Sequence, residues 1–251
     1  MSYKQLIVLS SDNKTYGSSH DFTIQLDKPM NFGFADFYIS VLKIDTWNSA
    51  PNISTERATQ TFTYSNGVDT RTLVIPQGIY TVDDLRSVIK SYMFSVGDYT
   101  GTADAPSYDI ELKPNYNTGK FTFTITGGYS IDWTTSNLYR LFGTVSAVKS
   151  ASYEAEIVGD ITDGLNNIQI HLSLCSGSSL LGGRLSDVVQ TYVPSSPPGA
   201  PLNIENRVKA PVKITSSMAQ TIRVYLTDNQ NRSVDLRGEP FSMTCLIEQS
   251  S

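Results

Sequence analysis

The feature that most constrains the fold is an alternation of apolar and polar residues near the C-terminus. Two stretches show it: 220–227, with Ile222, Val224 and Leu226, and 241–248, with Phe241, Met243, Cys245 and Ile247. Successive side chains of a β-strand point to opposite faces of its sheet, so this spacing is typical of half-buried strands. The sequence predicts a strand in each stretch. The polar turn Asp228–Asn231 and a second bend at 238–240 join them.

Similar patterns predict strands along most of the chain. Segments rich in Gly, Pro, Asn and Ser separate the strands and are typical of turns and loops. The expected strands lie at 4–10, 20–26, 36–47, 60–64, 72–76, 107–112, 119–126, 155–158, 166–174, 187–193 and 212–216. Many short strands at this spacing favour a β-sandwich or a jelly roll.

Helical patterns occur within one part of the chain. Thr81 and Asp84 have the spacing of a capping box, and apolar residues then recur at three- and four-residue steps until Gly97. We expect a helix at 81–96 and a short one at 136–143. The predicted fold is therefore all-β, a jelly-roll β-sandwich with an inserted α+β segment. The jelly-roll domain comprises 1–67 plus 146–251, and the inserted segment comprises 68–145.

The composition argues against two classes of partner. The net charge is −5 and the pI is about 5.0, which is unlike a nucleic-acid-binding protein. No apolar run approaches the roughly 18 residues of a membrane span, and the N-terminus lacks the pattern of a signal peptide. We expect a soluble protein without direct nucleic-acid contacts. Only 17% of residues are charged, which suits subunit interfaces and equally suits a sandwich with hydroxyl-rich faces.

Residues with catalytic or metal-binding chemistry are sparse. The two histidines, His20 and His171, lie on strand patterns without metal-ligand spacing, and we expect His171 on an exposed polar face. Cys175 and Cys245 lie in or beside apolar stretches and are expected to be buried free thiols. We predict no enzyme activity, no cofactor and no metal, and a hydrolase built on Cys175 is a minor alternative.

Two aromatic residues lie next to the second predicted helix. Tyr129 and Trp133 can be interpreted as a platform on which a carbohydrate stacks. The other interpretation is a buried Trp133 that anchors the helix.

Four motifs, taken in order, resemble the penton and minor capsid proteins of Polinton/Maverick elements, virophages and related double-stranded DNA viruses. The motifs are LIVLSSDNKTYGSSHDFTIQL at 6–26, IPQGIYTVDDL at 75–85, LYRLFG at 138–143, and LTDNQN at 226–231 with DLRGEP at 235–240. The resemblance rests on the four motifs occurring in the same order, and together they extend over nearly the whole chain. The resemblance implies a jelly roll, in some members with an inserted domain, of which five copies close an icosahedral vertex.

The resemblance also implies a function and a location. It favours a structural virion protein, the pentameric vertex subunit of a capsid; the alternative is a minor capsid, spike or lectin-like attachment protein that binds a host surface ligand. The implied partners are further copies of the chain, neighbouring major capsid protein subunits, and a host receptor or spike protein. The expected location is the virion, after a soluble stage in the infected cell.

The polar turn and the bend near the C-terminus are candidates for contacts between neighbouring subunits. The residues concerned are Asp228, Arg232, Arg237 and Glu239.

Overall fold

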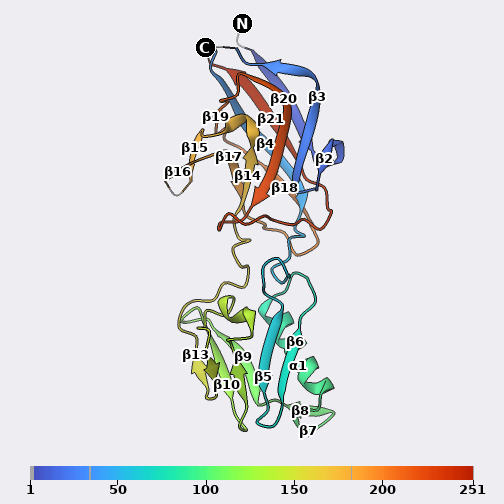
Figure 1. Cartoon of the computed structure of the whole chain (residues 1–251), viewed down its shortest axis with the longest axis vertical. Coiled ribbons are helices and arrows are strands. Elements are labelled where there is room, and N and C mark those ends of the chain that lie inside the picture. Colours follow the sequence, from blue (N-terminus) through green and yellow to red (C-terminus); the bar gives the residue numbers. More distant parts are fainter. Residues whose placement is uncertain (1–2, 34, 182, 251) are drawn as a thin grey trace. The chain divides into compact units, whose positions relative to one another are not determined.

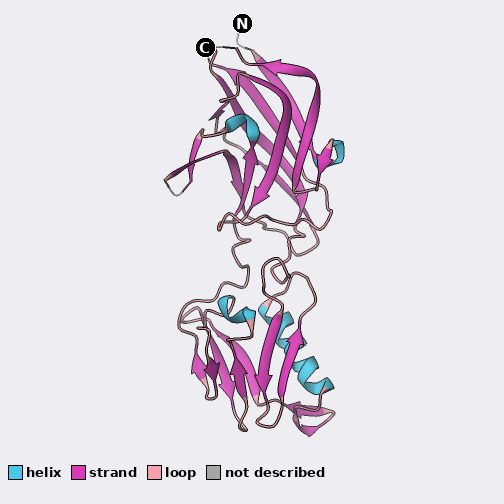
Figure 2. Ribbon diagram, viewed as in Figure 1, coloured by secondary structure: helices cyan, strands magenta, loops and turns pink. Residues whose placement is uncertain are grey.

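The computed structural model describes residues 3–33, 35–181 and 183–250 (Figure 1). The chain forms two compact units. The terminal unit comprises 1–50 and 164–251, and the inserted unit comprises 51–163. Each unit has its own hydrophobic core. Strands make up most of the regular structure in both units (Figure 2).

The boundaries of the inserted unit differ from the predicted limits of 68 and 145. Strand β5 (Thr61–Ser65) pairs with β6 (Thr70–Val74), and β13 (Tyr153–Glu154) pairs with β10 (Lys120–Ile125). These pairings place 51–67 and 146–163 in the inserted unit, which corrects the predicted domain limits. Strand patterns identify strands but not their partners, so the sequence could not assign these flanking segments.

Sheet A of the terminal unit contains both ends of the described chain. Its order is β1-β21-β4-β18, and β19 also pairs with β4. Strand β1 pairs with β21 in antiparallel register, from Lys4 opposite Glu248 to Ser10 opposite Ser242. The bounds are β1 Lys4–Ser10, β4 Phe37–Trp47, β18 Pro201–Glu205, β19 Val212–Lys213 and β21 Ser242–Gln249.

Sheet B has the order β17-β14-β20-β3-β2. The bounds are β2 Tyr16–Gly17, β3 Asp21–Asn31, β14 Ile168–Leu172, β17 Val188–Tyr192 and β20 Met218–Thr227. The two sheets contain eight longer strands, which in chain order are β1, β3, β4, β14, β17, β18, β20 and β21. Counted from one to eight in that order, sheet A has the strand order 1-8-3-6, and sheet B has the order 2-7-4-5. This is a jelly roll, as predicted.

The two C-terminal strands lie in different sheets. Strand β20 pairs with β3 and β14, whereas β21 pairs with β1 and β4. The polar segment between them therefore crosses from one sheet to the other and does not close a hairpin. The predicted inward residues are confirmed, since all are at most 1% exposed: Ile222, Val224, Leu226, Phe241, Met243, Cys245 and Ile247.

The inserted unit combines small sheets with one α-helix. The sheets have the orders β13-β10-β9 and β12-β11-β5-β6, beside the hairpin β7-β8. The remaining bounds are β7 Thr100–Thr102, β8 Ala105–Ser107, β9 Ile110–Asn115, β11 Ser130–Asp132, β12 Val148–Lys149 and α1 Val82–Ser95. The predicted helix is confirmed.

The predicted capping box of α1 is also confirmed. Thr81 Oγ1 accepts a hydrogen bond from the Asp84 amide, and the Asp84 carboxylate accepts one from the Thr81 amide. The second predicted helix is shorter, a 3-10 turn at Asn137–Arg140. Ser136 does not cap it, because its Oγ accepts a hydrogen bond from the Thr63 amide of β5 at 2.6 Å.

The terminal unit also carries short elements outside its two sheets. These are the 3-10 turns Ser11–Asn13 and Ser173–Cys175, and a separate hairpin of β15 (Ser179–Leu181) and β16 (Arg184–Ser186).

Candidate functional site

The turn after β20 is organised by a buried carboxylate. Asp228 is fully buried, and its Oδ1 accepts hydrogen bonds from the amides of Gln230 and Arg232, both at 2.9 Å. Its Oδ2 lies 2.7 Å from Nε of Arg232. Asn231 has a φ of 63°, a left-handed conformation that Asn tolerates. The Asp228 side chain shapes the turn and is enclosed by it, so the prediction that it contacts a neighbouring subunit is wrong.

The bend before β21 holds two charges on a fixed backbone. The Asp235 carboxylate accepts a hydrogen bond from the Arg237 amide at 2.7 Å. Ser49 Oγ donates to the carbonyl of the buried Leu236 at 2.8 Å. Arg237 is exposed and Glu239 is half-buried. Arg237 and Glu239, with the partly exposed Arg232 of the preceding turn, are thus positioned at the surface, and their contact with a second subunit stays a prediction.

Trp133 lies in the aromatic core of the inserted unit. It is 0% exposed, and its Nε1–H donates to the Tyr153 hydroxyl at 2.6 Å. Tyr129 stacks on the buried Tyr64, with the ring centroids 6.3 Å apart. The ring neighbours of Trp133 are Phe62, Phe123 and Phe142, at 5.7, 5.4 and 6.0 Å. The carbohydrate platform predicted at Tyr129 and Trp133 is wrong, because the indole has no exposed face.

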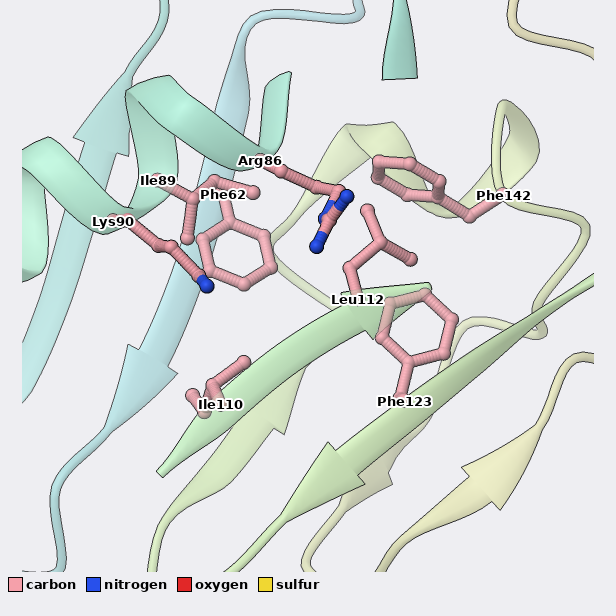
Figure 3. A pocket seen from close by; sticks show the side chains of 8 residues that line it. All are labelled: Phe62, Arg86, Ile89, Lys90, Ile110, Leu112, Phe123 and Phe142. Carbon is pink, nitrogen blue, oxygen red and sulfur yellow. The ribbon is translucent and has the colours of Figure 1, made fainter. Parts of the chain in front are cut away.

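A narrow cavity in the inserted unit lies beneath α1 (Figure 3). It has a volume of about 10 Å³, roughly the space of one water molecule. The Arg86 side chain extends over it toward Leu112 (Figure 3). The lining residues are Phe62, Arg86, Ile89, Lys90, Ile110, Leu112, Phe123 and Phe142. This space is a packing gap and is too small for an organic ligand.

A polar network joins strands β14 and β20 of sheet B to Asp187, the residue just before β17. His171 on β14 is 2% exposed, with Nδ1 2.8 Å from Oδ1 of Asp187 and Nε2 2.8 Å from Oγ1 of Thr227. The Tyr225 hydroxyl donates to the same carboxylate at 3.1 Å, and its ring stacks on the imidazole at 4.3 Å. The predicted exposure of His171 is wrong, because Tyr225 and Asp187 close over the ring.

The order Asp187–His171–Thr227 has the connectivity of a carboxylate–imidazole–hydroxyl triad. A nucleophile in such a triad must be reachable by its substrate, yet Thr227 is only 6% exposed. Its hydroxyl also lies 3.3 Å from Oε1 of Gln169. The network satisfies polar groups that the strands bury, and this geometry supports a structural role.

A bidentate ion pair lies beside the network on the same face of sheet B. Arg223 donates from Nε and Nη2 to the Asp21 carboxylate at 2.8 and 2.7 Å. Its guanidinium lies 4.7 Å from the centre of the Tyr225 ring. The hydrogen bond from Arg223 lowers the pKa of the Asp21 carboxyl below its ordinary value. The pair borders an open hollow of about 520 Å³ with the exposed Tyr16.

The prediction of buried free thiols is confirmed. Cys175 and Cys245 are both 0% exposed and form no disulfide. Burial raises the pKa of each thiol to about 12. A thiol with so high a pKa is protonated near neutral pH and is a poor nucleophile. The geometry therefore does not favour a hydrolase built on Cys175.

Metal-binding groups and membrane-spanning helices are both absent from the described residues. None of them form a group of three or more His, Cys, Asp and Glu side chains that could hold a metal ion. No helix in the same part of the chain has the length and apolar character needed to cross a bilayer.

With this geometry established, the chain can be compared with known proteins. No protein-family model and no curated protein matches the sequence. Among solved structures, the chain is similar to the penton protein of mavirus, with a TM-score of 0.54 and 10% sequence identity. The alignment covers 99% of this chain and 100% of the mavirus chain. The fold is penton-like. At so low an identity the similarity shows the fold alone, and function needs separate arguments.

The penton-like fold brings together groups that the sequence does not connect. In the network, His171 lies on β14, Tyr225 and Thr227 lie on β20, and Asp187 is the residue just before β17. Only the alternation of Tyr225 and Thr227 with buried residues marked them as neighbours on one face. Asp187 stood at the start of the expected strand 187–193, and no motif marked it as a partner of His171. Finding this network from the sequence would have required the pairing of β14 with β17 and β20.

Proposed function

We propose that this chain is a capsid protein that closes the fivefold vertices of an icosahedral double-stranded DNA virus as a ring of five copies. The observation that carries the proposal is the full-length similarity to the mavirus penton protein, which covers 99% of this chain. The ordered motifs of the sequence support it independently. Both point to the same combination of a jelly roll and an inserted segment.

The proposed mechanism is geometric. The two sheets of the terminal unit share one core, so this unit can act as a rigid wedge in a ring. Side-to-side burial between neighbouring wedges would supply the binding energy, and stable assemblies of this kind bury on the order of 2,000 Å² or more at each interface. Arg232, Arg237 and Glu239 are candidates for contacts at these boundaries.

The proposed location is the virion, and the proposed partners are further copies of the chain and neighbouring major capsid protein subunits. A vertex protein can also carry a spike or contact a host receptor. An attachment function based on Tyr129 and Trp133 is not supported, because Trp133 is buried and cannot contact a ligand. The vertex function is therefore the one that the molecule supports best.

Negative-stain electron microscopy of the purified full-length chain tests this function. We expect ring-shaped particles with fivefold class averages, which become more abundant as the protein concentration rises. The Arg237→Glu/Glu239→Arg double variant, which reverses both charges of the bend, tests the predicted subunit contact there. Loss of rings in this variant would support the predicted contact at the bend. A wild-type chain that stays monomeric at high concentration would contradict the proposed function.

A further inference from the structure

The outer strand of sheet A carries one charged residue, Lys4, at its first position, where it pairs with Glu248. Strand β1 is the last strand of this sheet in the described chain, so one of its backbone edges has no strand partner there. Leu6 and Val8 point to the same face, and each is 59% exposed. No charged residue lies within 5–9. Proteins commonly protect such edges with charges, proline or a covering segment, and an unprotected edge is a template for pairing with another chain.

The hairpin β15–β16 presents a second apolar surface. Leu180 and Leu185 lie opposite each other in its register and are 72% and 75% exposed. The hairpin forms a two-stranded sheet of its own and projects from the sandwich (Figure 1). Isolated two-stranded hairpins are at best marginally stable in water. Both its exposed leucines and its short strands would be stabilised by a partner.

These two surfaces lie on different sides of the terminal unit. The hairpin stands between β14 and β17 in the chain, and β17 is the end strand of sheet B. Strand β17 approaches β4, whereas the turn that follows β1 approaches β3 near the other end of sheet B. In Figure 1 the hairpin and strands β2 and β3 lie on opposite sides of the sandwich. One chain cannot join the two surfaces, so a contact between them must join two copies.

The distribution of charge favours contacts through the terminal unit. This unit contains 11 Lys and Arg and 11 Asp and Glu residues, a net charge of 0. The inserted unit contains 8 basic and 13 acidic residues, a net charge of −5. Copies of the terminal unit therefore approach without net repulsion, whereas copies of the inserted unit repel one another. The terminal unit of a second copy has no net charge, so it can approach the β1 edge without repulsion. We therefore take it as the partner of this edge.

We propose that the hairpin β15–β16 of one copy pairs with β1 of the next copy and extends sheet A across the subunit boundary. Backbone hydrogen bonds along the free edge would supply affinity, and Leu180 and Leu185 would cover Leu6 and Val8. Because the two surfaces differ, the contact is head-to-tail, and head-to-tail contacts form a ring when the rotation closes. This inference rests on the proposed ring and names the elements that would close it.

Disulfide trapping in the full-length chain tests this contact. The Leu6→Cys/Leu185→Cys variant should form covalent chains of up to five copies under mild oxidation, visible as a ladder on a non-reducing gel. Each single variant should give at most a covalent dimer. Cys175 and Cys245 are 0% exposed and do not compete. As a control, Leu6→Cys/Val68→Cys places the second thiol on a more exposed residue of the inserted unit, 90% against 75% for Leu185, and should give no ladder.

A second pair of variants measures how much Leu180 and Leu185 contribute to the free energy of assembly. Leu180→Asp/Leu185→Asp should raise the concentration needed for half-assembly by roughly tenfold or more, since two apolar side chains would lose their burial. Val68→Asp should leave this concentration unchanged. Suppose that the wild type forms five-copy rings, that Leu6→Cys/Leu185→Cys gives no ladder, and that Leu180→Asp/Leu185→Asp assembles like the wild type. The proposed contact is then wrong, while the proposed function stands. If the wild type never assembles, both are wrong.

Discussion

At the scale of single residues, His171 provides the clearest test of buried polar contacts. The His171→Leu variant removes one hydrogen-bond partner of Asp187 Oδ1, which keeps the Tyr225 hydroxyl, and one of Thr227 Oγ1, which keeps Gln169. A hydrogen bond contributes about 0.5–1.5 kcal/mol to stability, so the loss of two should lower the free energy of unfolding by about 1–3 kcal/mol. Urea denaturation measures it. Gln25→Leu, an exposed position on β3, is the control and should change stability by less than about 0.5 kcal/mol. Equal effects in both variants would contradict the structural role of the network.

The Asp21–Arg223 pair predicts a pH dependence. Arg223 lowers the pKa of Asp21 in the folded state, so the pair stabilises the fold above the ordinary carboxyl pKa of about 3.9 and loses this contribution as pH falls through the lowered value. Both side chains are about half exposed, at 53% and 42%, which limits the contribution to less than about 1 kcal/mol.

The Asp21→Asn variant checks this dependence by urea denaturation. It should be less stable than the wild type at pH 7, and the difference should shrink as the pH falls below the ordinary carboxyl pKa and through the lowered pKa of Asp21. Asp27→Asn, at an exposed position of the same strand, is the control. A stability difference between Asp21→Asn and the wild type that grows toward low pH would contradict the predicted direction of this pH dependence.

At the scale of elements, the capping box of α1 gives a prediction that the sequence and the structure share. The Thr81→Ala variant removes the hydroxyl that accepts from the Asp84 amide, and loss of such a cap costs about 1 kcal/mol. Thermal unfolding should register the change. Ser87→Ala, at an exposed position within the helix, should be neutral or slightly stabilising because Ala favours helices. If both variants behaved alike, the cap would contribute nothing.

The elements also show why part of the fold was predictable. Alternation at Ile222–Leu226 and Met243–Ile247 identifies which side chains point inward, and burial confirms each of them. Alternation does not identify partners, so it could not place β20 and β21 in different sheets. The same limit explains the wrong boundaries of the inserted unit and the wrong exposure of His171. Trp133 was ambiguous because a large aromatic side chain suits a core as well as a binding surface.

At the scale of the whole molecule, the two units have separate cores, and the chain enters and leaves the inserted unit at 50/51 and 163/164. A segment with its own core can fold alone. We expect residues 51–163, expressed separately, to unfold cooperatively on heating and to show near-ultraviolet circular dichroism from the packed Trp133. A fragment of 68–145, which lacks β5 and β13, is the control and should not fold. An unfolded 51–163 fragment would contradict the division into units.

The central claim is that full-length chains associate in fives through a penton-like jelly roll. Native mass spectrometry of the purified protein tests this claim most directly, because it counts the copies in each complex. The chain has a mass of 27.6 kDa, so a ring of five has five times that mass. We predict that this species dominates as the concentration is raised. A spectrum that contains only single chains, or complexes of any other fixed number, would contradict the account.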